Sequence, residues 1–289
     1  MSSSRVTKLF ERQDRSPVAE SGNGEAEPSE VPQANTNPNI QNFLRALSDP
    51  TNAQIDIVAV HGLNPTNTDF HAEMTWTASN GKMWLKDFLP KGLPMARILL
   101  FGYNANVAFR TSVAGIQEEA ENLLNRLALR RRSAGRPIIF VCHSLGGLVV
   151  KRALVTAKQT TRYINIKNAT YGIAFFGTPH RGSRDNKVLL GNIAASIARA
   201  ALRQPENSFL EALKKDSLFA DQLVQDFKQQ LEDYYILSFV ETQPYGSLGL
   251  IVDPESATLG LSLDREIRIS LAGNHKDICK FDSSDSDDY

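Results

Sequence analysis

A serine flanked by small residues ends an apolar run in the middle of the chain. Residues 138–147 read Ile-Ile-Phe-Val-Cys-His-Ser-Leu-Gly-Gly, so Ser144 stands where a buried strand would turn sharply into a helix. A strained turn of this kind, usually G-x-S-x-G, lifts a serine hydroxyl clear of a sheet so that it can attack a carbonyl group. Cys142 replaces the first glycine and is small enough for the turn to form. The segment predicts a nucleophilic serine.

A serine hydroxyl is a poor nucleophile until an imidazole takes its proton, and that imidazole needs an acid to orient it. On an α/β sheet these three residues occur in the chain order serine, acid, histidine, each in a loop after a strand. His275 follows the last predicted strand, and of the five histidines it alone lies C-terminal to both other candidates. The order therefore predicts His275 as the base.

Three carboxylates compete for the role of the acid. Glu241 falls at the tip of a predicted strand, where a triad carboxylate is expected. Asp253 and Glu255 follow in the next loop and would reach the same place if that loop folds back. Glu241 is favoured from its position, and the other two stay open as alternative acids.

Acyl transfer also needs N–H donors for the negative charge that develops on the substrate oxygen. Leu145, directly after the serine, is one predicted donor. The other is Leu63, in the sequence His61-Gly62-Leu63 after the first core strand. Gly62 would let the backbone approach the substrate closely, and His61 is either a substrate contact or a plain strand-end residue.

A second turn motif, 175–182, reads Phe-Phe-Gly-Thr-Pro-His-Arg-Gly and follows another predicted strand. Thr178, Pro179 and His180 are predicted to line the substrate pocket at the carboxyl edge of the sheet. A purely structural turn explains the composition equally well. His143, which precedes the serine, is also placed among the substrate-binding candidates.

The elements that must position these residues alternate along the chain. Apolar strands without strict alternation, separated by helices, predict an α/β fold with a mainly parallel sheet covered on both faces. Ligands bind such sheets at the carboxyl ends of the strands. The predicted strands are 54–60, 96–103, 137–142, 170–176, 234–240 and 266–271, and the two clearest helices are 112–131 and 145–157.

Four parts of the chain are distinguished: two terminal segments, the α/β domain itself and an insertion within that domain. Residues 1–50 are rich in Ser, Asn, Pro and Glu and are expected to be disordered or extended, with one helical turn at 43–47. The α/β domain is expected over 51–282. Within it, 183–232 is a helical insertion that either packs on the sheet or caps the pocket. Residues 283–289 form an acidic tail that is expected to fray.

Composition excludes several other functions. With 32 basic and 32 acidic residues the chain has no net charge to attract nucleic acid, and the basic run 130–132 is expected to be a solvated helix end. No run approaches the ~20 apolar residues of a membrane span, although peripheral membrane contact is compatible with the sequence. Neither a metal nor an organic cofactor is predicted, because phosphate loops and zinc-spaced ligands are missing. We expect a cytoplasmic protein with two free thiols, with an organelle or the periphery of a membrane as the alternative locations.

Several motifs together resemble the lipase-like α/β-hydrolases. They are Val-His-Gly-Leu at 60–63, Cys-His-Ser-Leu-Gly-Gly at 142–147, Phe-Gly-Thr-Pro-His-Arg-Gly at 176–182 and Asn-His-x-x-Ile-Cys-Lys-Phe at 274–281. The chain is most similar to the serine active site-containing proteins and the GPI inositol-deacylase-like group, over about residues 53–282. The resemblance implies Ser144 as nucleophile and His275 as base, and it favours Glu241 as acid.

The predicted activity is that of a serine hydrolase acting on a small-molecule acyl or lipid ester, or on a thioester. Release or transfer of an acyl group in a biosynthetic pathway would use the same residues. Similar domains occur in fungi as the first module of large receptors, so a signalling or oligomerisation module on a hydrolase scaffold is the alternative. A lipid-binding protein without turnover is a third, less favoured alternative.

Overall fold

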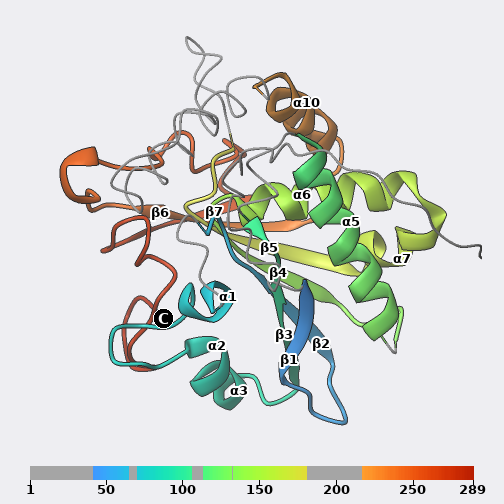
Figure 1. The fold of residues 1–289 in the computed structure, drawn as a ribbon, viewed down its shortest axis with the longest axis horizontal. Helices are drawn as coiled ribbons and strands as arrows, with labels where there is room; N and C mark the ends of the chain where they lie inside the picture. The colour runs from blue at the N-terminus through green and yellow to red at the C-terminus, as the bar shows by residue number, and fades with distance from the viewer. Residues whose placement is uncertain (1–41, 65–69, 106–112, 132, 181–216) are drawn as a thin grey trace, which may run out of the picture. The chain divides into compact units, whose positions relative to one another are not determined.

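A seven-stranded sheet organises the protein, in the spatial order β1-β3-β2-β4-β5-β6-β7 (Figure 1). The structure is a computed structural model, and it describes residues 42–64, 70–105, 113–131, 133–180 and 217–289. The strands are β1 (Phe43–Ser48), β2 (Ile55–Val60), β3 (Ala96–Gly102), β4 (Ile138–His143), β5 (Thr170–Phe176), β6 (Tyr235–Glu241) and β7 (Glu266–Leu271). Strands β2 to β7 run parallel, and among the described strands only β1 is antiparallel to its neighbour, β3. The predicted α/β class is confirmed.

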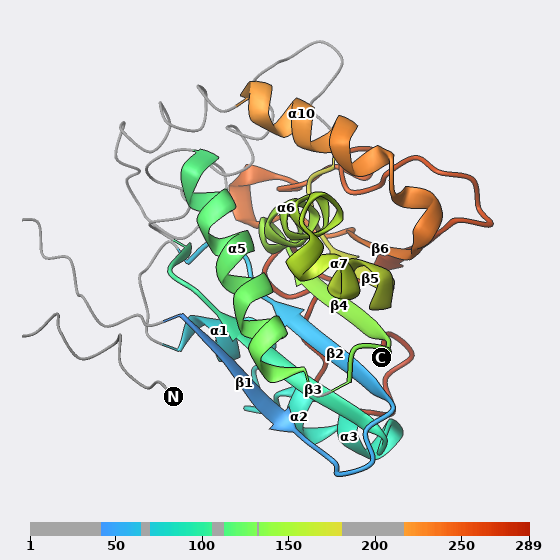
Figure 2. The same cartoon turned by 90° about the vertical axis from the view of Figure 1, so that its right-hand side faces the viewer.

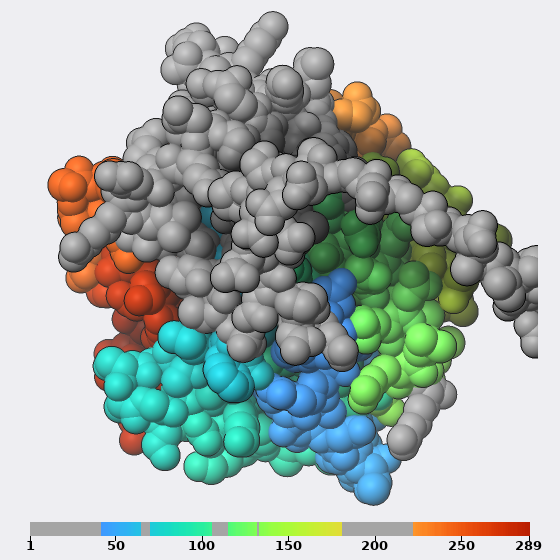
Figure 3. Space-filling view, in the orientation of Figure 1, coloured from blue at the N-terminus to red at the C-terminus, as the bar shows by residue number. Residues whose placement is uncertain are grey.

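Strand β1 corrects one prediction, because residues 43–47 form an edge strand rather than a helical turn. Phe43 pairs with Gly102 and Leu44 with Phe101. A Cβ on Gly102 would lie 2.2 Å from the ring of Phe43, so the glycine leaves room for that ring. Local sequence could not reveal this long-range pairing. In Figure 3 β1 (blue) is visible at the surface between the cyan and teal helices and the green helix α5 (Val113–Arg130).

Helices cover both faces of the sheet (Figure 2). The helices α5 (Val113–Arg130), α6 (Gly146–Gln159), α7 (Ile164–Ala169) and α10 (Ser217–Lys228) lie on one side. The short helices α1 (His71–Met74), α2 (Trp84–Asp87) and α3 (Leu89–Gly92) lie on the other. Short 3₁₀ turns occupy Thr161–Tyr163, Leu231–Asp233 and Gly246–Leu248. No helix among the described residues is long and apolar enough to cross a membrane.

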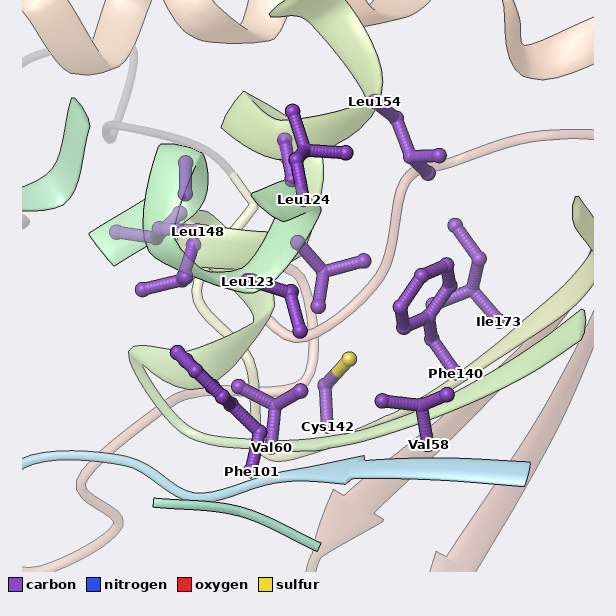
Figure 4. Packing of buried hydrophobic residues seen from close by; sticks show 14 of the residues in the cluster. Val58, Val60, Phe101, Leu123, Leu124, Phe140, Cys142, Leu148, Leu154 and Ile173 are labelled. Carbon is purple, nitrogen blue, oxygen red and sulfur yellow. The ribbon is translucent and has the colours of Figure 1, made fainter. Parts of the chain in front are cut away.

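The main core fills the space between the sheet and helices α5 and α6 (Figure 4). Phe140 and Cys142 point from β4 toward Leu123 of α5, and all three side chains are fully buried. Burying one large apolar side chain stabilises the fold by about 1.5–3 kcal/mol. This packing holds the end of β4 and the start of α6, where Ser144 lies, in one arrangement.

A buried ion network anchors the amino ends of the strands. The carboxylate of Asp56 accepts charged contacts from Arg97 at 2.9 Å, Arg131 at 2.8 Å and Arg136 at 3.1 Å. The side chain of Arg131 is only 5% exposed, so this member of the basic run 130–132 is not the solvated helix end that was predicted. The network is structural and lies at the edge of the sheet away from Ser144.

The described part of the predicted insertion packs on the body of the domain. Leu223 and Phe227 of α10 are 1% exposed and belong to the main core. Residues 183–216 of the insertion and 1–41 of the N-terminal segment lie outside the described residues. In the acidic tail, whose fraying stays a prediction, the ring of Tyr289 lies beside Trp84 and Phe281, at centroid distances of 6.0 and 5.6 Å. Its aromatic side chain gives the acidic tail an apolar contact.

Candidate active site

Ser144 occupies the sharp turn between β4 and α6. Its φ of +53° is the one positive value among the non-glycine residues that the structure describes. Such a conformation costs on the order of 1–3 kcal/mol and persists only when the surroundings hold it. The N–H of Ser144 donates to the carbonyl of Phe176 at 2.8 Å, and the hydroxyl of Thr178 donates to the carbonyl of Ser144 at 3.0 Å. Both flanks of the turn are therefore tied to the end of β5.

The two glycines that follow Leu145 allow neighbouring segments to lie against the start of α6. A Cβ on Gly146 would lie 2.3 Å from the carbonyl oxygen of His61, and one on Gly147 would lie 2.4 Å from the methyl group of Thr178. Cys142 replaces a glycine without conflict because its side chain points into the main core (Figure 4). Burial raises the pKa of its thiol well above the ordinary value, so this cysteine is an inert core residue.

His275 reaches the serine from the loop after β7. Its Nε2 lies 2.9 Å from the Oγ of Ser144, and both side chains are buried. The loop is a tight turn in which the N–H groups of Asp277 and Ile278 donate to the carbonyl of Asn274, at 2.9 and 3.0 Å. The hydroxyl can thus donate directly to the imidazole, as general-base activation requires.

Glu241, the last residue of β6, is the carboxylate that lies beside His275. Its Oε1 is 3.6 Å from Nδ1 of His275, and it also accepts a hydrogen bond from the N–H of Val252. A separation of 3.6 Å is an electrostatic contact rather than a hydrogen bond. Asp253 instead binds Ser256, accepting from its N–H at 2.9 Å and its hydroxyl at 2.7 Å. Glu255 is exposed, so of the three candidates the structure brings only Glu241 to the base.

The two predicted oxyanion donors lie in segments that meet at the serine. A Cβ on Gly62 would lie 2.8 Å from the Cβ and 3.3 Å from the Oγ of Ser144, so only glycine fits there. Among the described residues, the N–H groups of Leu63 and Leu145 have no hydrogen-bond acceptor. They remain available for a substrate oxygen.

His61 is held within the fold on both ring nitrogens. Its Nδ1–H donates to the carbonyl of Gly62 at 2.8 Å, and its Nε2 accepts from the N–H of Tyr103 at 3.2 Å. The ring of Tyr103 stacks on it at 4.3 Å, and the phenol donates to the carbonyl of His61 at 2.8 Å. Burial, followed by the nearby His71, lowers the pKa of His61 to about 3. His61 is therefore a neutral residue that shapes the loop carrying Gly62 and Leu63.

His143 is also turned away from solvent. Its Nε2 lies 2.8 Å from the carbonyl oxygen of His275, which can only accept, so Nε2 carries the proton. The two imidazole rings are 5.2 Å apart. Burial, followed by the charge of His275, lowers the pKa of His143 well below its ordinary value. The contact of His143 with the substrate stays a prediction. The structure shows a hydrogen bond from His143 to the loop that carries His275.

The turn after β5 contacts both the serine turn and the ring of His275. Gly177 has a φ of +53°, and a Cβ there would lie 3.1 Å from Nδ1 of His275. Thr178 holds the serine turn, as described above, and Pro179 is buried. The N–H of His180 donates to the carbonyl of Ser256 at 2.7 Å, and its ring meets Phe175 edge-on at 4.6 Å. Their predicted role in lining the pocket stays a prediction.

The sequence did not single out two residues of the site, Tyr103 and Gly177. Tyr103 clamps His61, and Gly177 makes room for the ring of His275. A glycine directly after an apolar strand was the available signal for a positive φ or a close approach. Tyr103 carried no such signal, because an aromatic residue at a strand end usually belongs to the core.

The fold and the site define the class of protein as an α/β-hydrolase of the serine-dependent type. The family model described as "Putative serine esterase (DUF676)" matches residues 52–227. The chain belongs to this family. The resemblance to lipase-like hydrolases is thereby confirmed, and with it the assignment to the serine hydrolases.

Among curated proteins, Protein SERAC1 of Mus musculus is 32% identical over 213 residues, covering 70% of this chain and 31% of the relative. The Homo sapiens protein of the same name is 32% identical over 207 residues, covering 68% of this chain and 30% of the relative. The chain thus spans about a third of the length of these relatives.

The solved structures agree with the fold. The mature form of the Bacillus licheniformis lipase BlEst2 superposes with a TM-score of 0.56 at 18% identity, covering 82% of this chain and 92% of that one. Its propeptide form superposes with a TM-score of 0.53 at 18% identity, covering 83% of this chain and 51% of that one. At this identity the likeness concerns the fold alone.

Proposed function

We propose that this chain hydrolyses an acyl ester or thioester through a covalent acyl-enzyme. Ser144 is the nucleophile, His275 the general base and acid, and Glu241 the carboxylate that orients His275. The N–H groups of Leu63 and Leu145 hold the oxyanion. The observation that carries the proposal is the 2.9 Å separation of Oγ and Nε2 on a serine with a φ of +53°.

The reaction proceeds in two halves. In the first, Oγ of Ser144 bonds to the substrate carbonyl carbon while its proton passes to Nε2 of His275. The tetrahedral intermediate then collapses, and the leaving alcohol or thiol takes that proton. In the second, water attacks the acyl-enzyme, gives a proton to His275 and releases the carboxylic acid as Ser144 recovers its proton.

Charge develops at two places during these steps, and each has a partner. The carbonyl oxygen becomes negative beside the N–H groups of Leu63 and Leu145, which have no acceptor in the part of the chain that the structure describes. Such an arrangement typically contributes 10²- to 10³-fold in rate per donor. The imidazole becomes positive 3.6 Å from the carboxylate of Glu241. An alcohol or amine acceptor in place of water would convert hydrolysis into acyl transfer with the same residues.

Reaction of the purified chain with a fluorophosphonate probe, followed by mass spectrometry of the modified peptide, tests the nucleophile. Labelling is expected at Ser144 and nowhere else. Ser238 is the matched control within the chain, since it is equally buried but donates to Glu266 instead of facing an imidazole. Ser144→Ala should abolish labelling and lower ester turnover by several orders of magnitude.

His275→Ala should slow labelling of Ser144 as severely, because nothing else near the hydroxyl can take its proton in the part of the chain the structure describes. Folded protein that does not label, or that labels equally after His275→Ala, would refute the proposal. The alternative of a signalling or oligomerisation module on a hydrolase scaffold would then take its place. A screen of acyl esters and thioesters of increasing chain length follows a positive result.

A further inference from the structure

The imidazole of His143 ties the two halves of the site together through the backbone. Its Nε2–H donates to the carbonyl oxygen of His275 at 2.8 Å, across 132 residues of sequence. His143 is the last residue of β4, and the next residue is Ser144. The nucleophile and the base are therefore joined twice, once by Oγ and Nε2 and once by this second hydrogen bond.

We propose that His143 is a positioning residue, which sets the peptide plane of His275 so that its ring presents Nε2 to Ser144. This inference rests on the proposed function and assigns His143 a role other than contact with the substrate. A positioning role suits a residue that touches the base through its carbonyl and not through its reacting nitrogen.

The loop that carries His275 explains why such a restraint matters. It leaves β7 after Leu271 and turns at once, with Gly273 packed against Ile278, where a Cβ would lie 3.2 Å from that residue. Local bonds on Asn274 shape the turn, but among the described residues His143 is the one that binds the His275 carbonyl. A displacement of ~1 Å at a reacting group costs about 10²-fold in rate.

The protonation state of His143 fits the same role. Burial first, and then His275, His71 and Lys280, lower the pKa of His143, whereas the hydrogen bond to the carbonyl of His275 raises it. A neutral ring with its proton on Nε2 donates to the carbonyl without opposing the positive charge that forms on His275 during the reaction. A charged side chain at this place would oppose it at a ring separation of 5.2 Å.

Two substitutions separate positioning from packing. His143→Phe keeps a ring of similar size but removes the donor, and His143→Gln keeps an N–H donor at a similar reach. We expect His143→Phe to slow both fluorophosphonate labelling of Ser144 and kcat by about 10- to 100-fold with little change in KM. His143→Gln should restore most of the rate.

Val155→Ala is the stability control, because Val155 is a buried residue near the far end of α6 from the serine turn. It should lower Tm yet leave the labelling rate at the parent value. If the parent labels at Ser144 and His143→Phe labels equally fast, the positioning inference is wrong while the proposed function stands. If the parent itself does not label, the proposed function fails and the inference fails with it. A slow Phe variant rescued by Gln supports both.

Discussion

The α-carbon of Gly177 lies against the imidazole of His275: a Cβ at this position would be 3.1 Å from Nδ1 and 3.2 Å from Cε1. Nδ1 is also the ring atom that lies 3.6 Å from Oε1 of Glu241. The glycine therefore decides how closely the base can approach the carboxylate, although it contributes no reactive group. Through Gly177, the turn after β5 contacts His275 in the loop after β7.

Gly177→Ala should lower kcat by about 10- to 100-fold, because a methyl group would push the ring of His275 aside. The same change adds a side chain at a φ of +53° and should cost roughly 1–3 kcal/mol of stability. Gly81→Ala is the matched control, since Gly81 has a φ of +79° but open space around a Cβ. It should lose similar stability and keep full activity. Equal activity in the two variants would contradict the role of Gly177.

Glu241→Gln should reduce kcat by about 10²- to 10⁴-fold, with the fold intact. The amide oxygen can replace Oε1 as acceptor of the Val252 N–H, but the substitution removes the negative charge that lies 3.6 Å from Nδ1 of His275 and stabilises the imidazolium. Asp253→Asn and Glu255→Gln should change kcat by less than about threefold, because Asp253 binds Ser256 and Glu255 is exposed. Steady-state kinetics on one ester measures all three. A larger loss at Asp253 or Glu255 would move the acid role there.

Acid should unfold the protein steeply, because three histidines are buried in the neutral form. The pKa is lowered to about 3 for His61, to about 4 for His71 and well below 6.5 for His143. Below pH 6.5 the unfolded chain takes up these protons and the folded chain does not. The free energy of unfolding therefore decreases as the pH is lowered. Burial raises the pKa of Glu119 from 4.5 to about 7. Between these two pH values the folded chain binds one proton at Glu119 that the unfolded chain does not, which offsets one of the three histidine protons.

The net difference of two protons predicts a slope of roughly 3 kcal/mol per pH unit between pH 6 and 5. Urea unfolding at pH 8, 7, 6 and 5 measures it. Glu119→Gln should steepen the slope toward about 4 kcal/mol per pH unit, since the opposing proton is lost. A stability that does not change over this interval would show that the three imidazoles bind protons in the folded state.

Lys151 should destabilise the fold at neutral pH. Its ammonium is 1% exposed and has no hydrogen-bond partner among the described residues, although it lies 5.6 Å from the ring of Phe175 and 5.9 Å from that of Phe227. Burial lowers its pKa from 10.5 to about 7. The unfolded chain holds this proton up to higher pH, so stability should rise as pH increases from 7 to 10.

Lys151→Met should therefore increase the free energy of unfolding by about 2–4 kcal/mol at pH 7 and remove the rise in stability above that pH. Denaturant unfolding of the parent and the variant at pH 7 and 9 separates the two effects. Because Lys151 lies in the second turn of α6, the labelling rate of Ser144 serves as the check that the serine turn is unchanged. A variant less stable than the parent at pH 7 would contradict the prediction.

The sequence by itself determined the elements whose signals are local. Apolar runs placed the six parallel strands, and the serine turn and the histidine after the last strand could be read at Ser144 and His275. These elements can be predicted from short stretches of sequence, because a strand buried on both faces and a strained turn each require particular residue types. The same locality explains why Glu241, Asp253 and Glu255 could be ranked but not separated.

Only the tertiary structure decided which distant groups meet. The contact of Glu241 with His275, the hydrogen bond of His143 to the same loop and the pairing of β1 with β3 all join segments far apart in the chain. Arg131 likewise donates to the buried carboxylate of Asp56, 75 residues away in the chain, and is not a solvated helix end. Composition and periodicity report the burial of a residue but not its partner, because the partner depends on how the strands are ordered in the sheet.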